Sequence, residues 1–493
     1  MTVSQSIGMT LLRTTALVVV ALAVGAVASL AGPPKAEAAR GLDIGFVADQ
    51  FGDNLLTNDD ANVRRRWWNR LRKTNSELAR VNLDWNQVAG SSPPADPSNP
   101  AEPSYDWTIP DTAVREAAAR GLTVAFTVVG APRWAQGANP PPEDEYRVGA
   151  WKPNPRMFGE FAEAAATRYS GKFGDLPRVR YWEAWNEPNL PRYLAPQWNG
   201  NKPKAPELYR RLLNEFYAAV KLVKRRNKVV AAGTSPFGDK RGGKRMRPHY
   251  FWREVLCLRN RKKLKKKKGC VKGEDRAHMD IYAHNPINAV KGDGPTTRPP
   301  NPDDGVPSNF KQLGRIVNKA NKRRTILPRR RNRPGWATEI WYESRPPEKK
   351  AVGVRKQARF MQQALYVLWK QKADVAFFLQ LRDSAYDPSV HPLLGFQTGV
   401  YFFDDKAKPS LHAVRFPFVA DRKNSRKVLL WGKAPKSGRL KVTQKGRGKR
   451  NVARFRVKAG RVFKETVRLG KTRGRHKLQA SLGGQKSLRW KLK

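Results

Sequence analysis

Eight short apolar runs separated by helix-like stretches constrain the fold of this chain more than any other feature of its sequence. The runs are 42–48, 78–85, 122–129, 179–185, 229–233, 279–283, 335–340 and 375–381. Between them lie stretches with apolar residues three or four positions apart, such as 155–169, 206–223 and 352–369. Strands that alternate with helices are typical of a parallel sheet, and eight such units favour closure into a barrel. We therefore predict an α/β fold, a (β/α)8 TIM barrel. An open doubly wound sheet is the alternative, although no G-x-G-x-x-G follows the first run.

The composition changes at residue 421. From there to the end, 26 Lys and Arg residues accompany only two acidic residues, Asp421 and Glu465. Short alternating runs at 428–431, 439–443, 452–457, 461–469 and 476–482 are typical of strands. We predict that the barrel covers residues 39–419 and that a small basic all-β domain, resembling a sandwich, covers 420–493. A disordered basic tail is the alternative, but the alternation of basic and apolar residues over 454–457 favours an ordered strand.

The first residues have the pattern of an export signal. Arg13 precedes an apolar run from Leu17 to Leu30, and the small residues Ala36 and Ala38 follow. This order predicts a signal peptide over 1–38 that is cleaved near Ala38, and hence a secreted or cell-wall associated protein. The alternative is an uncleaved membrane anchor, because the run approaches the roughly 17 residues that span a bilayer.

The chain has two cysteines, Cys257 and Cys270, thirteen positions apart. Outside the cytoplasm two such thiols are expected to form a disulfide. Two unpaired buried thiols are the alternative. A zinc pair is the weaker interpretation, because neither cysteine has a second ligand at C-x-x-C spacing and no histidine lies beside them.

Two glutamates stand at the ends of predicted barrel strands. Glu187 follows the fourth run in the sequence Trp-Glu-Ala-Trp-Asn-Glu-Pro-Asn, and Glu339 lies in the seventh run between two tryptophans. The carboxyl ends of the strands form the active-site face of such a barrel, so we expect these side chains to face each other. Apolar rings disfavour the charged form of a carboxyl group, which suits a proton donor. An acid and a nucleophile of this kind, about 5 to 5.5 Å apart, perform retaining glycoside hydrolysis.

At these positions the chain resembles glycoside hydrolase clan A, especially families 39 and 5, over residues 42 to 415. The resemblance rests on Trp-Asn-Glu-Pro at 185–188 and Thr-Glu at 338–339. It implies that Glu187 is the general acid/base and Glu339 the nucleophile. It also implies that Asn186 holds the sugar 2-hydroxyl, that Arg80 keeps the nucleophile ionised, and that the substrate is β-linked.

Aromatic residues near the strand ends are candidates for stacking on sugar rings. Residues 130–135 resemble the strand-three loop that contributes a stacking tryptophan in the clan, here Trp134, and Trp341 lies past the seventh strand. The alternative for either residue is a place in the core. Where the clan often has a tryptophan on strand eight, this chain has Phe378 and Gln380, and Gln380 is the expected substrate contact.

The sixth strand departs from the clan pattern. Ile287 stands where a tyrosine often contacts the nucleophile, and Tyr282 is the candidate to replace it. His284 is a candidate substrate contact or, alternatively, a structural histidine.

Other acidic residues in or near strands, namely Glu183, Asp84, Asp280 and Glu343, are expected to pair with barrel arginines. No H-E-x-x-H, Walker or G-x-S-x-G motif occurs, so the sequence predicts no metal and no nucleotide cofactor.

The chain carries 96 Lys and Arg against 41 Asp and Glu, a net charge of +55. A mean hydropathy of −0.67 excludes a multi-pass membrane protein. Basic runs at 261–268 and 311–333 flank predicted helices, where a charge run is usually a solvated face. The sharper hypothesis is that the basic C-terminal domain binds an anionic cell-wall or matrix polymer.

Together these patterns predict an exported retaining glycosidase that acts on a polysaccharide or oligosaccharide. The alternatives are a non-catalytic binder of cell-wall or anionic polysaccharide, and a nucleic-acid or wall-polymer binder that uses the barrel as a scaffold.

Overall fold

A computed structural model describes residues 37–48, 55–141, 149–288, 292–389, 396–445, 449–469 and 476–492. Most of the predicted signal peptide, residues 1–36, lies outside these ranges. Within them, no helix combines the length and the apolar character that a bilayer crossing requires.

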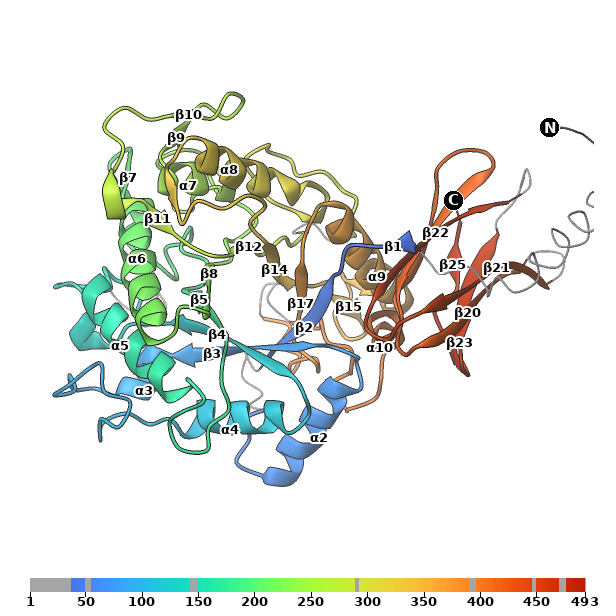
Figure 1. The fold of residues 1–493 in the computed structure, drawn as a ribbon, viewed down its shortest axis with the longest axis horizontal. Coiled ribbons are helices and arrows are strands. Elements are labelled where there is room, and N and C mark those ends of the chain that lie inside the picture. The colour runs from blue at the N-terminus through green and yellow to red at the C-terminus, as the bar shows by residue number, and fades with distance from the viewer. Residues whose placement is uncertain are drawn as a thin grey trace, which may run out of the picture.

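Eight parallel strands form the central sheet (Figure 1). They are β2 (Asp43–Ala48), β3 (Leu78–Asp84), β4 (Thr123–Val129), β5 (Tyr181–Ala184), β8 (Lys228–Ala231), β12 (Tyr282–His284), β14 (Gly335–Ile340) and β17 (Val375–Leu379). Neighbours in the sheet follow chain order, with β17 beside β2. A parallel bridge between Val230 and Ile281 joins β8 to β12. The sheet is thus nearly closed as the predicted (β/α)8 barrel.

Helices surround the sheet. They are α2 (Ala61–Arg72), α3 (Trp85–Ala89), α4 (Thr108–Ala118), α5 (Pro155–Arg168), α6 (Ala205–Val223), α7 (Pro248–Val255), α8 (Lys311–Lys322), α9 (Val354–Lys370) and α10 (Pro409–Arg415). α5 shows why they form where they do: the Asn154 side chain accepts hydrogen bonds from two backbone N–H groups of the first turn, and Pro155 occupies the first helical position. Phe158 and Phe161 lie on the buried face of α5.

The barrel strands are buried on both faces. One apolar cluster fills the barrel interior and includes Val47, Ala125, Ala283, Trp336 and Phe377. Their strand neighbours belong to a second cluster, which packs against the surrounding helices. This alternation, which follows from the two-residue period of a strand, determines which side chains can reach the barrel axis.

Short strands and 3-10 helices lie in the loops that connect the barrel strands and helices. They are β6 (Trp198–Asn199), β7 (Lys202–Pro203), β9 (Leu258–Arg259), β10 (Lys265–Lys266), β11 (Ala277–His278), β13 (Ile326–Leu327), β15 (Ser344–Arg345), β16 (Val352–Gly353), η2 (Arg133–Ala135), η3 (Gly273–Asp275) and η4 (Pro307–Asn309). Cys257 and Cys270 form the predicted disulfide, with Cα atoms 5.7 Å apart, and it closes the loop that carries the β9–β10 hairpin.

Two antiparallel sheets follow the barrel and confirm the predicted all-β region. Their strands are β18 (Phe418–Arg422), β19 (Lys427–Lys433), β20 (Gly438–Lys445), β21 (Lys449–Val457), β22 (Val462–Arg468), β23 (Lys477–Leu482), β24 (Gln485–Lys486) and β25 (Trp490–Lys491). One sheet has the order β1-β22-β19-β18, where β1 is Glu37–Ala38, and the other has β21-β20-β23-β24 with β25 beside β23. The predicted boundary at residues 419–420 falls inside β18.

The all-β region is docked on helix α9. Trp431 of β19 lies with its ring 5.4 Å from Tyr366 and 5.9 Å from Trp369. The buried ammonium of Lys433 pairs with Glu77 at 2.6 Å and donates to the carbonyl of Leu42 at 2.9 Å. Aromatic burial and a satisfied buried charge therefore join the two parts of the chain.

Candidate active site

The turn after β5 presents Glu187 at the carboxyl ends of the strands. Trp185 and Glu187 both adopt positive φ angles, 77° and 43°, which non-glycine residues rarely do. The Trp185 ring packs edge-on against Phe158 of α5 at 5.3 Å, and the Glu187 N–H donates to the carbonyl of Gly233 at 2.8 Å. These contacts hold the turn in a strained conformation of the kind found at functional sites.

A β-bulge directs Glu339 toward the barrel axis. Ala337 of β14 pairs with Ala376 of β17, but Ile340 pairs with Phe378, so β14 contains one residue more than its partner strand over this stretch. Trp336 faces the barrel interior and Ile340 packs in the outer cluster. The extra residue lets Glu339 leave the regular alternation and approach Arg80.

Arg80 of β3 connects three strand ends. Its Nε donates to Glu183 Oε2 at 2.7 Å and its Nη2 donates to Asn186 Oδ1 at 3.1 Å. Its Nη1 lies 4.0 Å from Glu339 Oε2 and has no hydrogen-bond partner among the residues that the structure describes. The guanidinium is 1% exposed. Arg80 therefore positions Asn186 and presents positive charge to Glu339.

Asn285 and Thr338 connect Glu187 to the seventh strand. The Asn285 Nδ2 donates to Glu187 Oε1 at 3.0 Å, and its Oδ1 accepts from Thr338 Oγ1 at 2.8 Å. Thr338 immediately precedes Glu339, so a two-bond chain of side chains joins the segments that carry the two glutamates. This chain also fixes the orientation of the Asn285 amide, since Oδ1 must face the hydroxyl donor.

Burial raises the pKa of both glutamates. For Glu187 desolvation is the largest cause, opposed by the Asn285 hydrogen bond and the charge of Arg80. For Glu339 desolvation is again the largest cause, the Glu187 charge adds to it, and Arg80 opposes it. Because each carboxylate disfavours ionisation of the other, the pair retains a proton at higher pH than isolated glutamates would.

Two tryptophans predicted for sugar stacking are half-buried near the strand ends. The Trp341 side chain makes a hydrogen bond to Glu339 that lowers the pKa of that carboxyl group. Trp134 lies in η2, after β4, where its ring packs edge-on against Trp85 at 5.8 Å and its Nε1 donates to the carbonyl of Gly90 at 3.3 Å. Trp341 is thus brought next to the glutamates.

Gln380 follows β17 with a positive φ of 48° and is buried. Its Nε2 donates to the carbonyl of Phe396, and its Oε1 accepts from Ser384 Oγ at 3.4 Å. The Gln380 amide therefore makes its hydrogen bonds with Ser384 and Phe396. Phe378 lies in the outer layer, with its ring 5.8 Å from that of Phe46.

The structure does not bring Tyr282 and His284 to the cluster around Glu187 and Glu339. Ala283 faces the barrel interior, so its two neighbours in β12 point the other way. The Tyr282 ring stacks at 6.0 Å on Phe310, which precedes α8. Tyr282 therefore does not replace the nucleophile-contacting tyrosine that the clan often has at the position of Ile287.

His284 makes its hydrogen bond on the outer face of the barrel sheet, away from the barrel interior. Thr234 Oγ1 accepts from Trp252 Nε1 at 3.2 Å and shares a second hydrogen bond with His284 Nδ1, 2.9 Å away. Burial lowers the pKa of His284 to about 3, so the ring is neutral. This arrangement matches the structural alternative for His284.

Sequence patterns indicated some of the positioning residues but not all of them. Glu183 pairs with Arg80 as expected of a structural acid, and it also accepts from Thr127 Oγ1 at 2.7 Å and from the Gly233 N–H at 2.9 Å. Asn285 and Thr338 were not predicted to be site residues, although Thr338 belongs to the Thr-Glu pair on which the resemblance rests. Their proximity to the two glutamates along adjacent strands was the only available indication.

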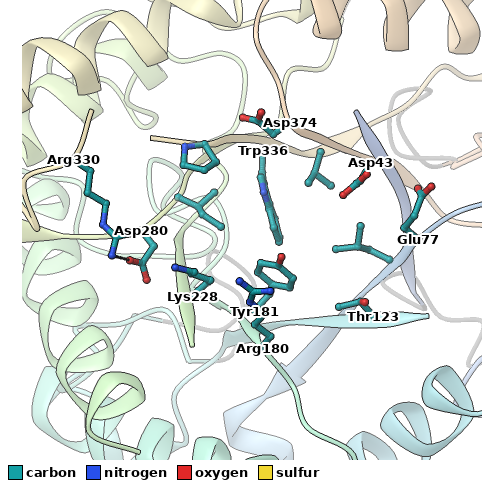
Figure 2. A pocket seen from close by; sticks show the side chains of 14 residues that line it. Asp43, Glu77, Thr123, Arg180, Tyr181, Lys228, Asp280, Arg330, Trp336 and Asp374 are labelled. Carbon is teal, nitrogen blue, oxygen red and sulfur yellow. Dashed lines mark ion pairs between the residues drawn. The ribbon is translucent and has the colours of Figure 1, made fainter. Parts of the chain in front are cut away.

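Figure 2 shows a cavity at the opposite end of the barrel, where the strands begin. Its volume is about 370 Å³. Trp336 and Tyr181 line it, with ring centroids 5.0 Å apart. Several charged groups at its rim form ion pairs, for example Asp280 with Arg330 at 3.1 Å and Asp374 with Arg40 at 3.1 Å. Ion pairs at this end of a barrel stabilise the fold, and the catalytic residues of such barrels lie at the other end.

Comparison with solved structures supports the same fold. A family 39 glycoside hydrolase from Bacteroides cellulosilyticus WH2 superposes with a TM-score of 0.52 at 16% identity, covering 87% of this chain and 81% of that one. The fold is that of clan A, family 39-like barrels. A family 39 enzyme from Xanthomonas axonopodis pv. citri (TM-score 0.49, 13% identity, 88% and 93% covered) and a monomeric β-xylosidase from Caulobacter crescentus CB15 (0.49, 12%, 88% and 98%) are further neighbours. No protein-family model and no curated protein sequence matches the chain.

Proposed function

We propose that this clan A-like barrel is a retaining glycoside hydrolase that cleaves β-configured O-glycosidic bonds of a polysaccharide or oligosaccharide. The observation that carries the proposal is the convergence of Glu187 and Glu339 on one buried network, through Asn285 and Thr338 on one side and Arg80 on the other. The charge of Glu187 raises the pKa of Glu339, so the two carboxyl groups are close enough to interact, as two carboxyl groups that flank one bond must be.

In the first step, protonated Glu187 donates its proton to the glycosidic oxygen while the Glu339 carboxylate attacks the anomeric carbon. The leaving alcohol carries away the proton, and a glycosyl ester forms on Glu339. In the second step, Glu187 takes a proton from a water molecule while the water oxygen attacks the anomeric carbon. The bond between that carbon and Glu339 breaks, which releases the sugar and the Glu339 carboxylate. Burial raises the pKa of both carboxyl groups, so the pair keeps a proton near neutral pH, and the mechanism requires that this proton is on Glu187.

Arg80 and Asn186 have supporting roles in this mechanism. The charge of Arg80 opposes protonation of Glu339, which must be ionised to attack. Asn186 accepts from Arg80 through Oδ1, so its amide N–H groups are the part left to hold a sugar hydroxyl. The indole of Trp341 makes a hydrogen bond to Glu339 that lowers the pKa of that carboxyl group and so favours the ionised form that attacks.

Mass spectrometry after incubation with mechanism-based fluorosugars of several configurations tests the proposal. We expect a glycosyl adduct on the peptide that contains Glu339, and no adduct in the Glu339→Gln variant. An adduct names the sugar and establishes retention. Failure of every probe to label the wild type, together with retained polysaccharide binding, would favour the alternative of a non-catalytic binder.

We also propose that the protein is exported and cleaved near Ala38. The apolar N-terminal run and the disulfide support this location. In the structure Glu37 and Ala38 pair with Lys464 and Phe463, so cleavage after Ala38 removes the short strand β1. The N-terminal sequence of protein recovered from a secreting host tests the proposal, and an intact Met1 would contradict it.

A second proposed function concerns attachment. We propose that the basic C-terminal region holds the enzyme on an anionic cell-wall or matrix polymer. The composition supports this proposal, since 26 basic residues accompany two acidic ones from residue 421 onward. The negative charge of a bound polymer would reduce the electrostatic repulsion among these basic side chains.

A further inference from the structure

Sheet β21-β20-β23-β24 presents a face that consists of cations and neutral polar groups. Alternation along β20 and β21 buries Leu440, Val442 and Phe455, so the residues between them face outward. The outward cations, which we call the cationic face, are Arg439, Lys441, Arg454, Arg456, Lys477, Lys486 and Lys491. These strands contain no Asp or Glu.

The register places like charges directly opposite each other. Arg439 pairs with Arg456, and Lys441 with Arg454, across the β20–β21 ladder. Lys477 pairs with Lys491 in the same way across β23 and β25. Like charges at directly opposite positions destabilise a sheet. Solvent-exposed sheets ordinarily mix the two signs, so this arrangement costs stability unless an anion occupies the face.

No ion pair involves the cationic face within the described parts of the chain. The two acidic residues of the C-terminal region, Asp421 and Glu465, lie in β18 and β22 of the other sheet. Asp421 is already paired there with Lys423 at 2.7 Å. The charges of the cationic face are thus left for a partner outside the chain.

The geometry points to a linear acidic polysaccharide as that partner. We propose that the cationic face binds such a polymer and thereby performs the attachment proposed above, on which this inference rests. Adjacent strands lie about 4.8 Å apart, so Arg454, Lys441 and Lys486 form a row across the sheet with Ser481 between the last two. Such a row suits carboxylates repeated along a chain.

Neutral groups on the same face favour a sugar polymer over a single-stranded nucleic acid. Thr443 and Ser481 lie among the cations on the outward side and offer hydroxyl groups that can exchange hydrogen bonds with sugar hydroxyls. The outward positions of β20, β21 and β23 in the described residues include no aromatic side chain. Proteins that bind single-stranded nucleic acids use aromatic side chains to stack the bases, so this face lacks the usual platform.

Two full-length variants that each lose four charges test the proposal. In the face variant, Arg439, Lys441, Arg454 and Arg456 are replaced by Gln. In the matched control, Lys262, Lys263, Lys265 and Lys266 of the β9–β10 loop, which are exposed, are replaced by Gln. Both variants have the same net charge, so only the position of the lost charges differs. The probes are polygalacturonate, its carboxyl-reduced neutral form and duplex DNA, in affinity electrophoresis at physiological ionic strength.

We expect the wild type and the control to bind polygalacturonate alike, the face variant to bind it about tenfold more weakly, and none to bind the neutral form. Melting temperature checks folding, and we expect the face variant to be at least as stable as the wild type because repulsive pairs are removed. Equal weakening in both variants would overturn the proposal in favour of diffuse charge. Binding of DNA but not polygalacturonate would also overturn it.

Hydrolysis of a small neutral aryl glycoside separates this inference from the catalytic proposal. The face variant should retain wild-type turnover of any such substrate, because its substitutions lie in the all-β region. An inactive wild type that still shows face-dependent binding would contradict the glycosidase proposal alone. An active wild type without face-dependent binding would contradict the attachment alone.

Discussion

Arg80 makes its short hydrogen bond with Glu183, at 2.7 Å, whereas its nearest nitrogen to Glu339 stops at 4.0 Å. The strong partner of Arg80 is therefore the structural acid Glu183. The candidate nucleophile Glu339 makes no hydrogen bond with Arg80 and interacts with it only through the positive charge of the guanidinium. Glu183 is held in turn by Thr127 and by the Gly233 N–H. This order lets Arg80 remain fixed while the charge on Glu339 changes during a reaction.

Replacement of Arg80 by Gln should leave the buried Glu183 carboxylate without its cation. We expect the free energy of unfolding to fall by about 3–5 kcal/mol, measured by urea denaturation. The double variant Arg80→Gln, Glu183→Gln should recover much of this stability but not the activity, because Asn186 and Glu339 still lack the guanidinium. Recovery of activity in the double variant would show that Arg80 acts only on stability.

Glu187→Gln should affect substrates according to how much their leaving groups need a proton. For a glycoside with an alkyl or sugar leaving group we expect kcat to fall by about 10²–10⁴-fold, because the proton donor is lost. An aryl glycoside whose leaving phenol is acidic should lose much less in the first step. Burst and steady-state kinetics on the two substrate types measure the difference, and an equal loss on both would argue against the acid role.

Asn285→Ala should shift the pH profile through Glu187. The Asn285 amide donates to the Glu187 carboxylate and so lowers the pKa of that group. Its removal should raise this pKa and move the alkaline limb of kcat/KM to higher pH. Thr338→Val, which frees the Asn285 amide to turn, should move the limb in the same direction by less. An unchanged limb in both variants would contradict the assignment.

Glu339→Gln should change the pH dependence of stability as well as activity. Burial raises the pKa of Glu339 in the folded state above its ordinary value near 4.3. Stabilisation by such a group is full below its unfolded pKa and is lost as the pH rises through the folded pKa. Relative to the wild type, the variant should therefore gain melting temperature as the pH rises above about 4. Parallel melting curves across this range would contradict the prediction.

His284→Asn should reduce stability without changing the chemistry. The variant loses the imidazole ring, which lies between Thr234 and Gly305 and shares a hydrogen bond with Thr234. We expect the free energy of unfolding to fall by about 1–3 kcal/mol, measured by denaturation. Because His284 points away from the barrel interior, kcat and KM of the folded fraction should stay at wild-type values. A selective rise in KM would instead favour a role in substrate binding.

Much of the barrel could be predicted from local sequence. The eight apolar runs correspond to the eight strands, because strands buried on both faces must be apolar along their whole length. The position of Glu187 and Glu339 at the carboxyl ends followed from the same pattern, since all parallel strands end at one face. The disulfide between Cys257 and Cys270 followed from the number of cysteines and from the expectation that the protein is exported.

The details of the candidate site depended on contacts between distant segments. A β-bulge in β14 directs the Glu339 side chain toward Arg80. The hydrophobic period of a sequence does not reveal one extra residue in a strand. Tyr282 and His284 are one residue out of phase with the barrel interior, so the face they occupy follows from the register of β12. The partner of Arg80 was decided likewise by which acid lay nearer in three dimensions.

The sequence by itself determined the order of strands and helices, the two glutamates at strand ends and the basic composition after residue 421. Only the tertiary structure decided which side chains meet and which cations share a face. The physical reason is that periodicity and composition act along the chain, whereas hydrogen bonds such as Asn285 to Glu187, and the pairing of Arg439 with Arg456, join residues that only the register of the folded strands brings together.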